Sequence, residues 1–119
     1  MKKREYNKIR LELLYLSKKI MEEKQPEYTN NNKDVLYNFK SIGGRINVEP
    51  LKVWAIFFDK HVQSILSNIT NDDIIPAEPI ETRFADAINY LVLGLALMVD
   101  VNKENHKKIL IEYKNFYNE

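Results

Sequence analysis

Residues 79–99 carry a long apolar run that two strongly polar side chains interrupt. Between Phe84 and Val99 only Asp86 and Asn89 are strongly polar. A helix that is apolar on every side must be covered by other helices, because a surface position would leave much of it in water. The sequence therefore predicts an all-α bundle in which residues 79–99 form a buried central helix.

Periodicity and helix-ending signals predict a single domain over residues 1–119, a bundle of four long helices and one short helix. Three glycines and four prolines are too few for a sandwich or barrel rich in turns. Residues 3–23 repeat apolar side chains at spacings of three and four, and Gln25-Pro26 is expected to end this helix. The repeat consists of Tyr6, Ile9, Leu13, Leu16 and Ile20.

The other expected elements follow from local signals. Residues 27–33 form a polar loop, and Asp34 caps a short helix that Gly43-Gly44 stops. A third long helix begins at Asn47 or Glu49, has Pro50 in its first turn and runs to Ile69. A last helix over residues 103–117 has apolar side chains on more than one face. We interpret this breadth as a wrap around the bundle or a subunit contact, and we expect a homo-oligomer.

Composition excludes several classes of protein. The net charge of +1 gives no general attraction to nucleic acid or to an anionic membrane. Cysteine is absent, so disulfides and thiolate metal sites are excluded and a reducing cytosol is the natural compartment. The apolar run is shorter than a membrane span. We expect a cytoplasmic protein with no membrane partner and no nucleic-acid partner.

Asp86 is the residue of the central helix that most needs a partner. An ionised carboxylate inside a bundle is unfavourable unless an arginine, a metal, a hydrogen-bond donor or a ligand pairs with it. Arg83 and Asn89, each three positions away, share its face of the helix. Two interpretations fit this cluster: a structural network that fixes helix register, or a ligand site.

Several short motifs resemble those of small phage-encoded helical domains of the "nucleotide modification associated" kind. The pattern Asp-x-x-Asn-Tyr is present as Asp86, Asn89 and Tyr90, with Glu78 before it. Two further segments resemble the family's Tyr-x-Asn-Phe helix start and its Asp-Lys helix: Tyr37-Asn38-Phe39-Lys40-Ser41-Ile42 and Phe58-Asp59-Lys60-His61. The resemblance covers about residues 33–99, and it extends more distantly to the MazG-type all-α nucleoside triphosphate pyrophosphatases. It implies a nucleotide ligand and, for a phage-encoded chain, the host cytoplasm.

The chain departs from the pyrophosphatase pattern at the metal site. The MazG-type helix bears Glu-x-x-Asp, which holds magnesium together with a Glu-x-x-Glu on a neighbouring helix. Here Arg83 stands three positions before Asp86, and the preceding helix has Asp59 as its only acidic residue after Leu51. A cation at this position repels a metal but can hold phosphate oxygens. The sequence therefore favours a binding protein over an enzyme.

Three functions compete. The first is a phage-type protein that binds or sequesters a nucleotide or cyclic nucleotide, such as a host defence signal, without hydrolysing it and without a cofactor. Its ligand-binding residues would be Arg83, Lys60 and Arg45 at phosphates, Asn89 and Asp86 at a base or ribose, and Trp54 or Tyr90 as stacking surfaces. The second is a magnesium-dependent nucleotide diphosphohydrolase that uses Asp59, Glu78, Glu81 and Asp86. The third is a structural or protein-interaction module.

Overall fold

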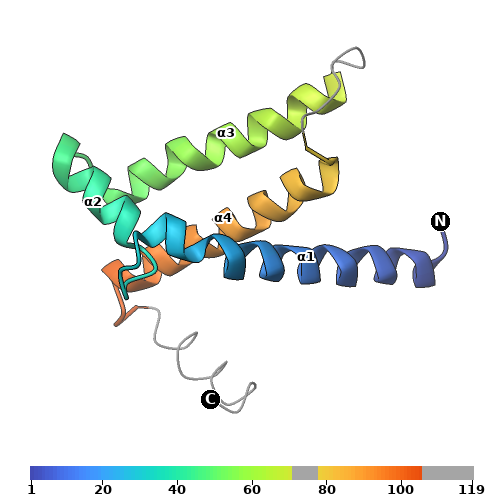
Figure 1. Ribbon diagram of the computed structural model, residues 1–119, viewed down its shortest axis with the longest axis horizontal. Helices are drawn as coiled ribbons and strands as arrows, with labels where there is room; N and C mark the ends of the chain where they lie inside the picture. The colour runs from blue at the N-terminus through green and yellow to red at the C-terminus, as the bar shows by residue number, and fades with distance from the viewer. Residues whose placement is uncertain (71–77, 106–119) are drawn as a thin grey trace.

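The computed structural model describes residues 1–70 and 78–105, which form four helices and no strand. The expected all-α fold is confirmed (Figure 1). The four helices are α1 (Lys3–Thr29), α2 (Tyr37–Ile46), α3 (Pro50–Thr70) and α4 (Ile80–Val101). Most of the predicted last helix lies outside the described residues, and Lys103 to Asn105 form a turn.

α4 is the central helix, packed against α1 on one side and α3 on the other (Figure 1). The buried residues of α4 are Ala85, Asp86, Asn89, Gly94, Leu97 and Val99. Its other face is exposed at Leu91, Val92, Leu95 and Met98. The expected burial of this helix therefore holds for one face, against which α1 and α3 pack most extensively among the described helices.

The length of α4 corrects one expectation from the sequence. With 22 residues, it is the one described helix long and apolar enough to cross a membrane by length and composition. The apolar run starts at Phe84 and is by itself shorter than a membrane span. The helix begins four residues earlier, at Ile80, and is therefore longer than the run. Its polar residues Asp86 and Asn89 lie on the buried face, whereas Leu91, Val92, Leu95 and Met98 are exposed.

A layer of aromatic rings joins α2, α3 and α4. The ring of Phe39 meets the rings of Phe57 and Tyr90 edge-on, with centroids 6.3 and 6.2 Å apart. Trp54 stacks on Phe58 at 5.1 Å, and its Nε1 donates a hydrogen bond of 2.6 Å to the carbonyl oxygen of Tyr90. Edge-on and offset ring pairs add about 0.5–1.5 kcal/mol each beyond the area that they bury. The buried apolar residues beside this layer are Leu36, Phe39, Val53 and Leu97.

α1 continues past its predicted end and contains Pro26 in its last turns. The missing N–H of proline removes one helical hydrogen bond there, but other groups close the turn. Thr29 Oγ1 donates to the carbonyl oxygen of Gln25 at 2.9 Å. The N–H of Asn30, which is in the left-handed conformation at φ 50°, donates to the carbonyl oxygen of Pro26. The predicted polar loop therefore begins at Asn30.

Asp34 organises the turn before α2, where the sequence predicted a helix cap. Its Oδ1 accepts a hydrogen bond of 2.9 Å from the N–H of Leu36, one residue before the helix begins. Its other oxygen lies 2.6 Å from Nζ of Lys40, which also lies 2.8 Å from Asp100 Oδ2. The hydrogen bond from Lys40 lowers the pKa of Asp34. Lys40 therefore ties α2 to the preceding turn and to the end of α4.

The glycine pair of α2 does not stop the helix. α2 passes through Gly43 and Gly44 and ends at Ile46, because Asn47 adopts the left-handed conformation at φ 58° and its N–H bonds to the Gly43 carbonyl oxygen. α3 begins at Pro50, directly after Glu49, which was one of the two predicted starting residues. Gly43 instead allows a close approach of the connection to α3, since a Cβ there would lie 2.4 Å from the carbonyl oxygen of Val48.

The two neighbouring glycines are expected to respond in opposite directions to alanine. Gly43→Ala places a methyl group against the Val48 carbonyl oxygen, so we expect a net loss of about 1–2 kcal/mol in the free energy of unfolding. Gly44→Ala meets no atom within 4 Å, so it should stabilise the helix by about 0.5–1 kcal/mol. Urea unfolding of both variants measures the difference. Equal effects of the two substitutions would contradict the close approach at Gly43.

Candidate functional site

Five ionisable side chains gather where α1, α3 and the first half of α4 meet. Asp86, only 8% exposed, is influenced by the charges of Lys24 on α1, His61 on α3, Glu78 before α4 and Arg83 on α4. Among the described residues, none of these cations comes within 4.0 Å of an Asp86 carboxylate oxygen. The cluster is therefore a group of charges held near one another without a direct ion pair at Asp86.

Burial dominates the protonation of this cluster. It raises the pKa of Asp86 above 3.8, although the positive charges of Lys24, His61 and Arg83 act against the rise. Burial also lowers the pKa of His61 below 6.5, against the negative charges of Asp86 and Glu78. In addition, Nε of Arg83 is buried and has no hydrogen-bond partner in the described part of the chain. Arg83 therefore has a buried N–H donor that no described residue accepts.

Asp86→Asn is expected to stabilise the unliganded protein at neutral pH. The folded-state pKa of Asp86 lies above its unfolded value of 3.8. Its contribution to stability is therefore complete below pH 3.8 and is lost as the pH rises through the folded-state pKa. Removing the buried charge should raise the free energy of unfolding by about 1 kcal/mol at pH 7 and leave it unchanged near pH 3.

Urea unfolding at several pH values tests this expectation. Asp59→Asn is the matched control, because Asp59 is exposed and accepts a hydrogen bond from Gln63 on the same helix. It should leave stability within about 0.5 kcal/mol of the original at every pH. A loss of stability in Asp86→Asn at pH 7 would mean that Asp86 is well paired in the folded protein.

Asn89 joins α4 to α1 rather than facing an open space. Its Nδ2 donates a hydrogen bond of 2.9 Å to the carbonyl oxygen of Ser17, and both residues are buried. Ser17 in turn donates from Oγ to the carbonyl oxygen of Leu14 at 2.8 Å. The amide of Asn89 therefore holds two helices in register, and this hydrogen bond accounts for a polar residue on the buried face.

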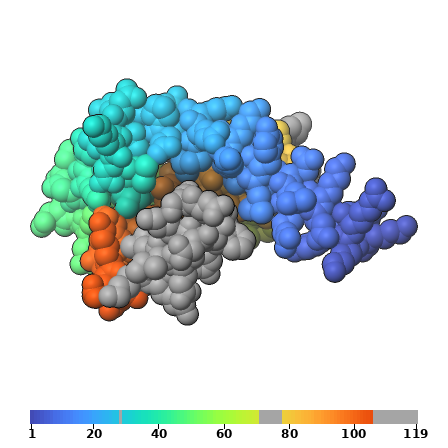
Figure 2. Space-filling model, turned by 90° about the horizontal axis from the view of Figure 1, so that it is seen from below, coloured from blue at the N-terminus to red at the C-terminus, as the bar shows by residue number. Residues whose placement is uncertain are grey.

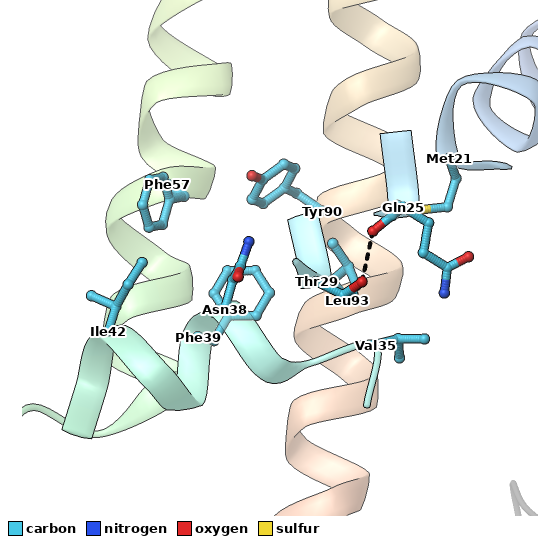
Figure 3. Close-up of a pocket in the computed structure, with 10 residues that line it drawn as sticks. All are labelled: Met21, Gln25, Thr29, Val35, Asn38, Phe39, Ile42, Phe57, Tyr90 and Leu93. Atoms are coloured by element: carbon cyan, nitrogen blue, oxygen red, sulfur yellow. Dashed lines mark hydrogen bonds between the residues drawn. The ribbon is translucent and has the colours of Figure 1, made fainter. Parts of the chain in front are cut away.

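Tyr90 forms one wall of a cavity of about 190 Å³ enclosed by all four helices (Figure 3). The lining residues are Met21, Gln25, Thr29, Val35, Asn38, Phe39, Ile42, Phe57, Tyr90 and Leu93. Most of the wall is apolar, and amide groups are supplied by Gln25 and Asn38. The Tyr90 ring also lies 4.3 Å from the ring of His61. Tyr90 therefore contacts both the cavity and a member of the charged cluster.

The remaining ligand residues expected from the sequence lie apart from this cavity. Trp54 packs against Gly94 and bonds to the backbone of Tyr90, so it belongs to the α3–α4 contact. Arg45 is exposed near the end of α2 and donates to Ser41 Oγ at 2.7 Å. Lys60 is exposed, with Nζ 5.5 Å from the ring centroid of Phe57.

The four carboxylates considered for magnesium are not brought together. Asp59, Glu78 and Glu81 are exposed, whereas Asp86 is buried. In residues 1–70 and 78–105, no three His, Asp or Glu side chains are arranged to hold a metal ion. Of the other three carboxylates, only Glu78 influences the pKa of Asp86. The described geometry therefore offers no common metal site for this set.

α1 contributes to the site, which the sequence did not predict. Lys24 acts on Asp86, and Met21, Gln25 and Thr29 line the cavity. All but Met21 lie beyond the end predicted for the helix, because Gln25-Pro26 predicts its termination. The Thr29 hydroxyl, which bonds to a carbonyl oxygen one turn earlier, is the local signal that could have extended the helix.

No protein-family model matches this chain, and no curated protein or solved structure shows significant similarity to it.

Proposed function

We propose that this protein binds a nucleotide without hydrolysing it, with the base in the cavity beside Tyr90 and the phosphates near the charged cluster. The observation that supports this proposal is a convergence of the three motif segments. The first segment contributes Asn38 and Phe39 to the cavity. The other two contribute His61, whose ring contacts Tyr90, and Asp86, whose charge acts on His61.

The size and lining of the cavity suit a nucleobase. Its volume of about 190 Å³ is below the roughly 300–1,000 Å³ of pockets that enclose a whole ligand, but it exceeds the roughly 150 Å³ cavity that holds benzene in an engineered protein. The base would enter, and the sugar and phosphates would remain outside. Aromatic contacts to a base contribute about 1–3 kcal/mol, and the Asn38 amide can pair with the edge of the base.

The neighbouring cluster has the groups that a ribose phosphate needs. Arg83 has a buried Nε without a partner in the described structure, and a guanidinium binds phosphate oxygens in a two-point geometry. Lys24 adds a second positive charge. The Asp86 carboxylate, which accepts no hydrogen bond within residues 1–70 and 78–105, can accept one from a ribose hydroxyl. Arg83 also stands where a pyrophosphatase would carry a metal ligand, which favours binding without cleavage.

A thermal-shift screen with nucleotides and cyclic nucleotides, in the absence of magnesium, tests the proposal. At a nucleotide concentration 100 times Kd, binding adds about 2.7 kcal/mol of stability, equivalent to about 10 °C in Tm for a chain of this size. We expect Asn38→Ala and Arg83→Gln each to weaken binding at least tenfold. Arg45→Gln, an exposed arginine away from the cavity, is the control and should leave the affinity unchanged.

The fate of the bound molecule separates this proposal from the alternatives. The nucleotide should be recovered intact after the complex is heated. Magnesium-dependent release of phosphate or pyrophosphate that Asp86→Asn abolishes would replace the proposal with a diphosphohydrolase. The absence of a thermal shift with every nucleotide would overturn the proposal and leave a protein-interaction module.

A further inference from the structure

The first half of α1 extends beyond the rest of the protein. None of residues 3–16 is buried, and the first buried residue of the helix is Ser17. Figure 1 shows this end of α1 pointing away from α2, and in Figure 2 it protrudes as a blue arm. Helical turns without tertiary contacts are marginally stable in water. We call residues 3–16 the α1 arm.

The α1 arm carries an apolar surface that the described part of the chain leaves in water. Tyr6 and Ile9 are 57% and 53% exposed, and Leu11, Leu14 and Tyr15 are also exposed. The arm forms one wall of an open groove of about 700 Å³, and Ile80 and Phe84 of α4 form part of the other. An exposed apolar patch of this kind marks an interaction surface.

The apolar repeat of α1 extends beyond the part of the helix that is buried against the rest of the described chain. Spacings of three and four from Tyr6 to Ile20 are those of a coiled-coil seam. Ile20 is buried within the chain, whereas Tyr6 and Ile9, two turns or more further along the same seam, are exposed. We therefore expect a second helix to pack against the first half of this seam.

The exposed area of the chain is large enough to supply a stable interface. The protein exposes 9489 Å², whereas a compact protein of 14.1 kDa exposes about 6,700 Å². Its radius of gyration is 16.5 Å, against about 13.5 Å for a compact chain of this length. The difference in area, about 2,800 Å² over all 119 residues, exceeds the roughly 800 Å² that each partner buries in a standard interface.

We propose that two copies of this chain form a symmetric dimer in which the two α1 helices pair antiparallel, each arm lying along the groove of the other copy. The α1 arm has four basic and two acidic side chains, whereas residues 17–29 have three of each. An antiparallel pair places each basic arm beside the neutral second half of its partner's helix, whereas a parallel pair places the two basic arms side by side.

Residues 106–119 are less suitable occupants of this groove. The end of α4 lies beside the residues that follow α1, since Asp100 pairs with Lys40 and lines a common pocket with Asp34. The first turn of the arm is at the opposite end of α1, about 40 Å away for a helix of 27 residues, and Leu16 at its near end is about 20 Å away. A helix of 14 residues spans about 21 Å, which is too short to cover the first turns of the arm.

Sedimentation equilibrium of the full chain, without nucleotide, tests the dimer. The original protein should have twice the mass of 14.1 kDa, and Ile9→Asp and Tyr15→Asp should be monomers with α2, α3 and α4 intact by circular dichroism. Leu66→Asp and Ile69→Asp are matched controls, because these residues of α3 are 52% and 65% exposed and lie outside the groove. Both controls should remain dimers. A monomeric original protein would overturn the proposal, and so would a dimer that persists in Ile9→Asp and Tyr15→Asp.

Cysteine substitution tests the antiparallel orientation, because the chain has no native cysteine. In an antiparallel pair the two ends of the arms are far apart, so Lys3→Cys should form no disulfide under oxidising conditions, since the two Cα atoms must come within about 7 Å. Leu13→Cys, near the middle of the pairing, should form a covalent dimer. Efficient disulfide formation by Lys3→Cys would overturn the antiparallel arrangement. If nucleotide raises the Tm of monomeric Ile9→Asp as much as that of the original protein, nucleotide binding does not depend on the dimer.

Discussion

Asn89→Asp is expected to destabilise the protein by about 3 kcal/mol or more at neutral pH. The Asn89 amide donates a hydrogen bond of 2.9 Å to the carbonyl oxygen of Ser17 in the α1–α4 contact. A carboxylate there has no hydrogen to donate, and its negative charge faces a carbonyl oxygen in a buried position. Burial of an uncompensated charge is among the most unfavourable single changes in a folded protein.

The pH dependence identifies the cause of this loss. Burial and the facing carbonyl oxygen raise the pKa of the introduced carboxyl, because both disfavour its charged form. The protonated carboxyl can donate to Ser17, so stability should recover as the pH falls towards 4. Urea unfolding at pH 4 and pH 7 measures this recovery.

Two controls accompany Asn89→Asp. Asn89→Leu removes the donor without adding a charge, and it should lose about 1–3 kcal/mol independently of pH. Asn105→Asp makes the same chemical change at an exposed residue and should have little effect. If Asn89→Asp is as stable as the original protein at pH 7, the hydrogen bond between α4 and α1 does not form.

Gly94→Ala is expected to lose about 2–3 kcal/mol of stability. A Cβ at this position would lie 2.4 Å from Cζ2 and 2.5 Å from Cε2 of Trp54. The indole cannot easily move aside, because its Nε1 is bonded to the carbonyl oxygen of Tyr90 and its ring is stacked on Phe58. Overpacking of this kind outweighs the gain of about 1 kcal/mol that alanine brings to a helix.

A double-mutant cycle assigns that loss to the contact. Trp54→Phe removes the part of the ring that meets the new methyl group, at the cost of its own packing and hydrogen bond. We therefore expect Gly94→Ala to lose at least 1 kcal/mol less in the Trp54→Phe background than in the original chain, measured by urea unfolding. Gly44→Ala, which meets open space, is the helix-propensity control. Additive effects of Gly94→Ala and Trp54→Phe would rule out the close contact.

The all-α fold could be predicted because its signals are local. These signals are the scarcity of glycine, the apolar spacings of three and four, and Pro50 at a helix start. Each of them depends on only a few neighbouring residues. The wrong boundaries at Pro26 and Gly43 came from reading such signals without tertiary context. Pro26 is tolerated because Thr29 and Asn30 close the turn, and Gly43 is needed for a close approach rather than for a left-handed cap.

The site could be predicted only in part. The apolar run identified Asp86 and Asn89 as unusual, and the motifs drew attention to Tyr90. Sequence could not say that Asn89 bonds to α1 while Asp86 stays without an ion pair, because this depends on how two helices cross. Nor could it bring Lys24 to Asp86, since the two residues lie 62 positions apart and meet only in the folded chain. The cytoplasmic location and the phage origin remain predictions.

Trp54 gives the protein an internal optical probe of the proposed site. It is the only tryptophan in the chain, and its indole N–H is bonded to the backbone of Tyr90, whose ring lines the cavity. Indole emission is sensitive to the polarity and hydrogen bonding around the ring. A molecule that displaces Tyr90 on entering should therefore change the fluorescence of the unlabelled protein, so that a simple titration can follow occupancy in solution.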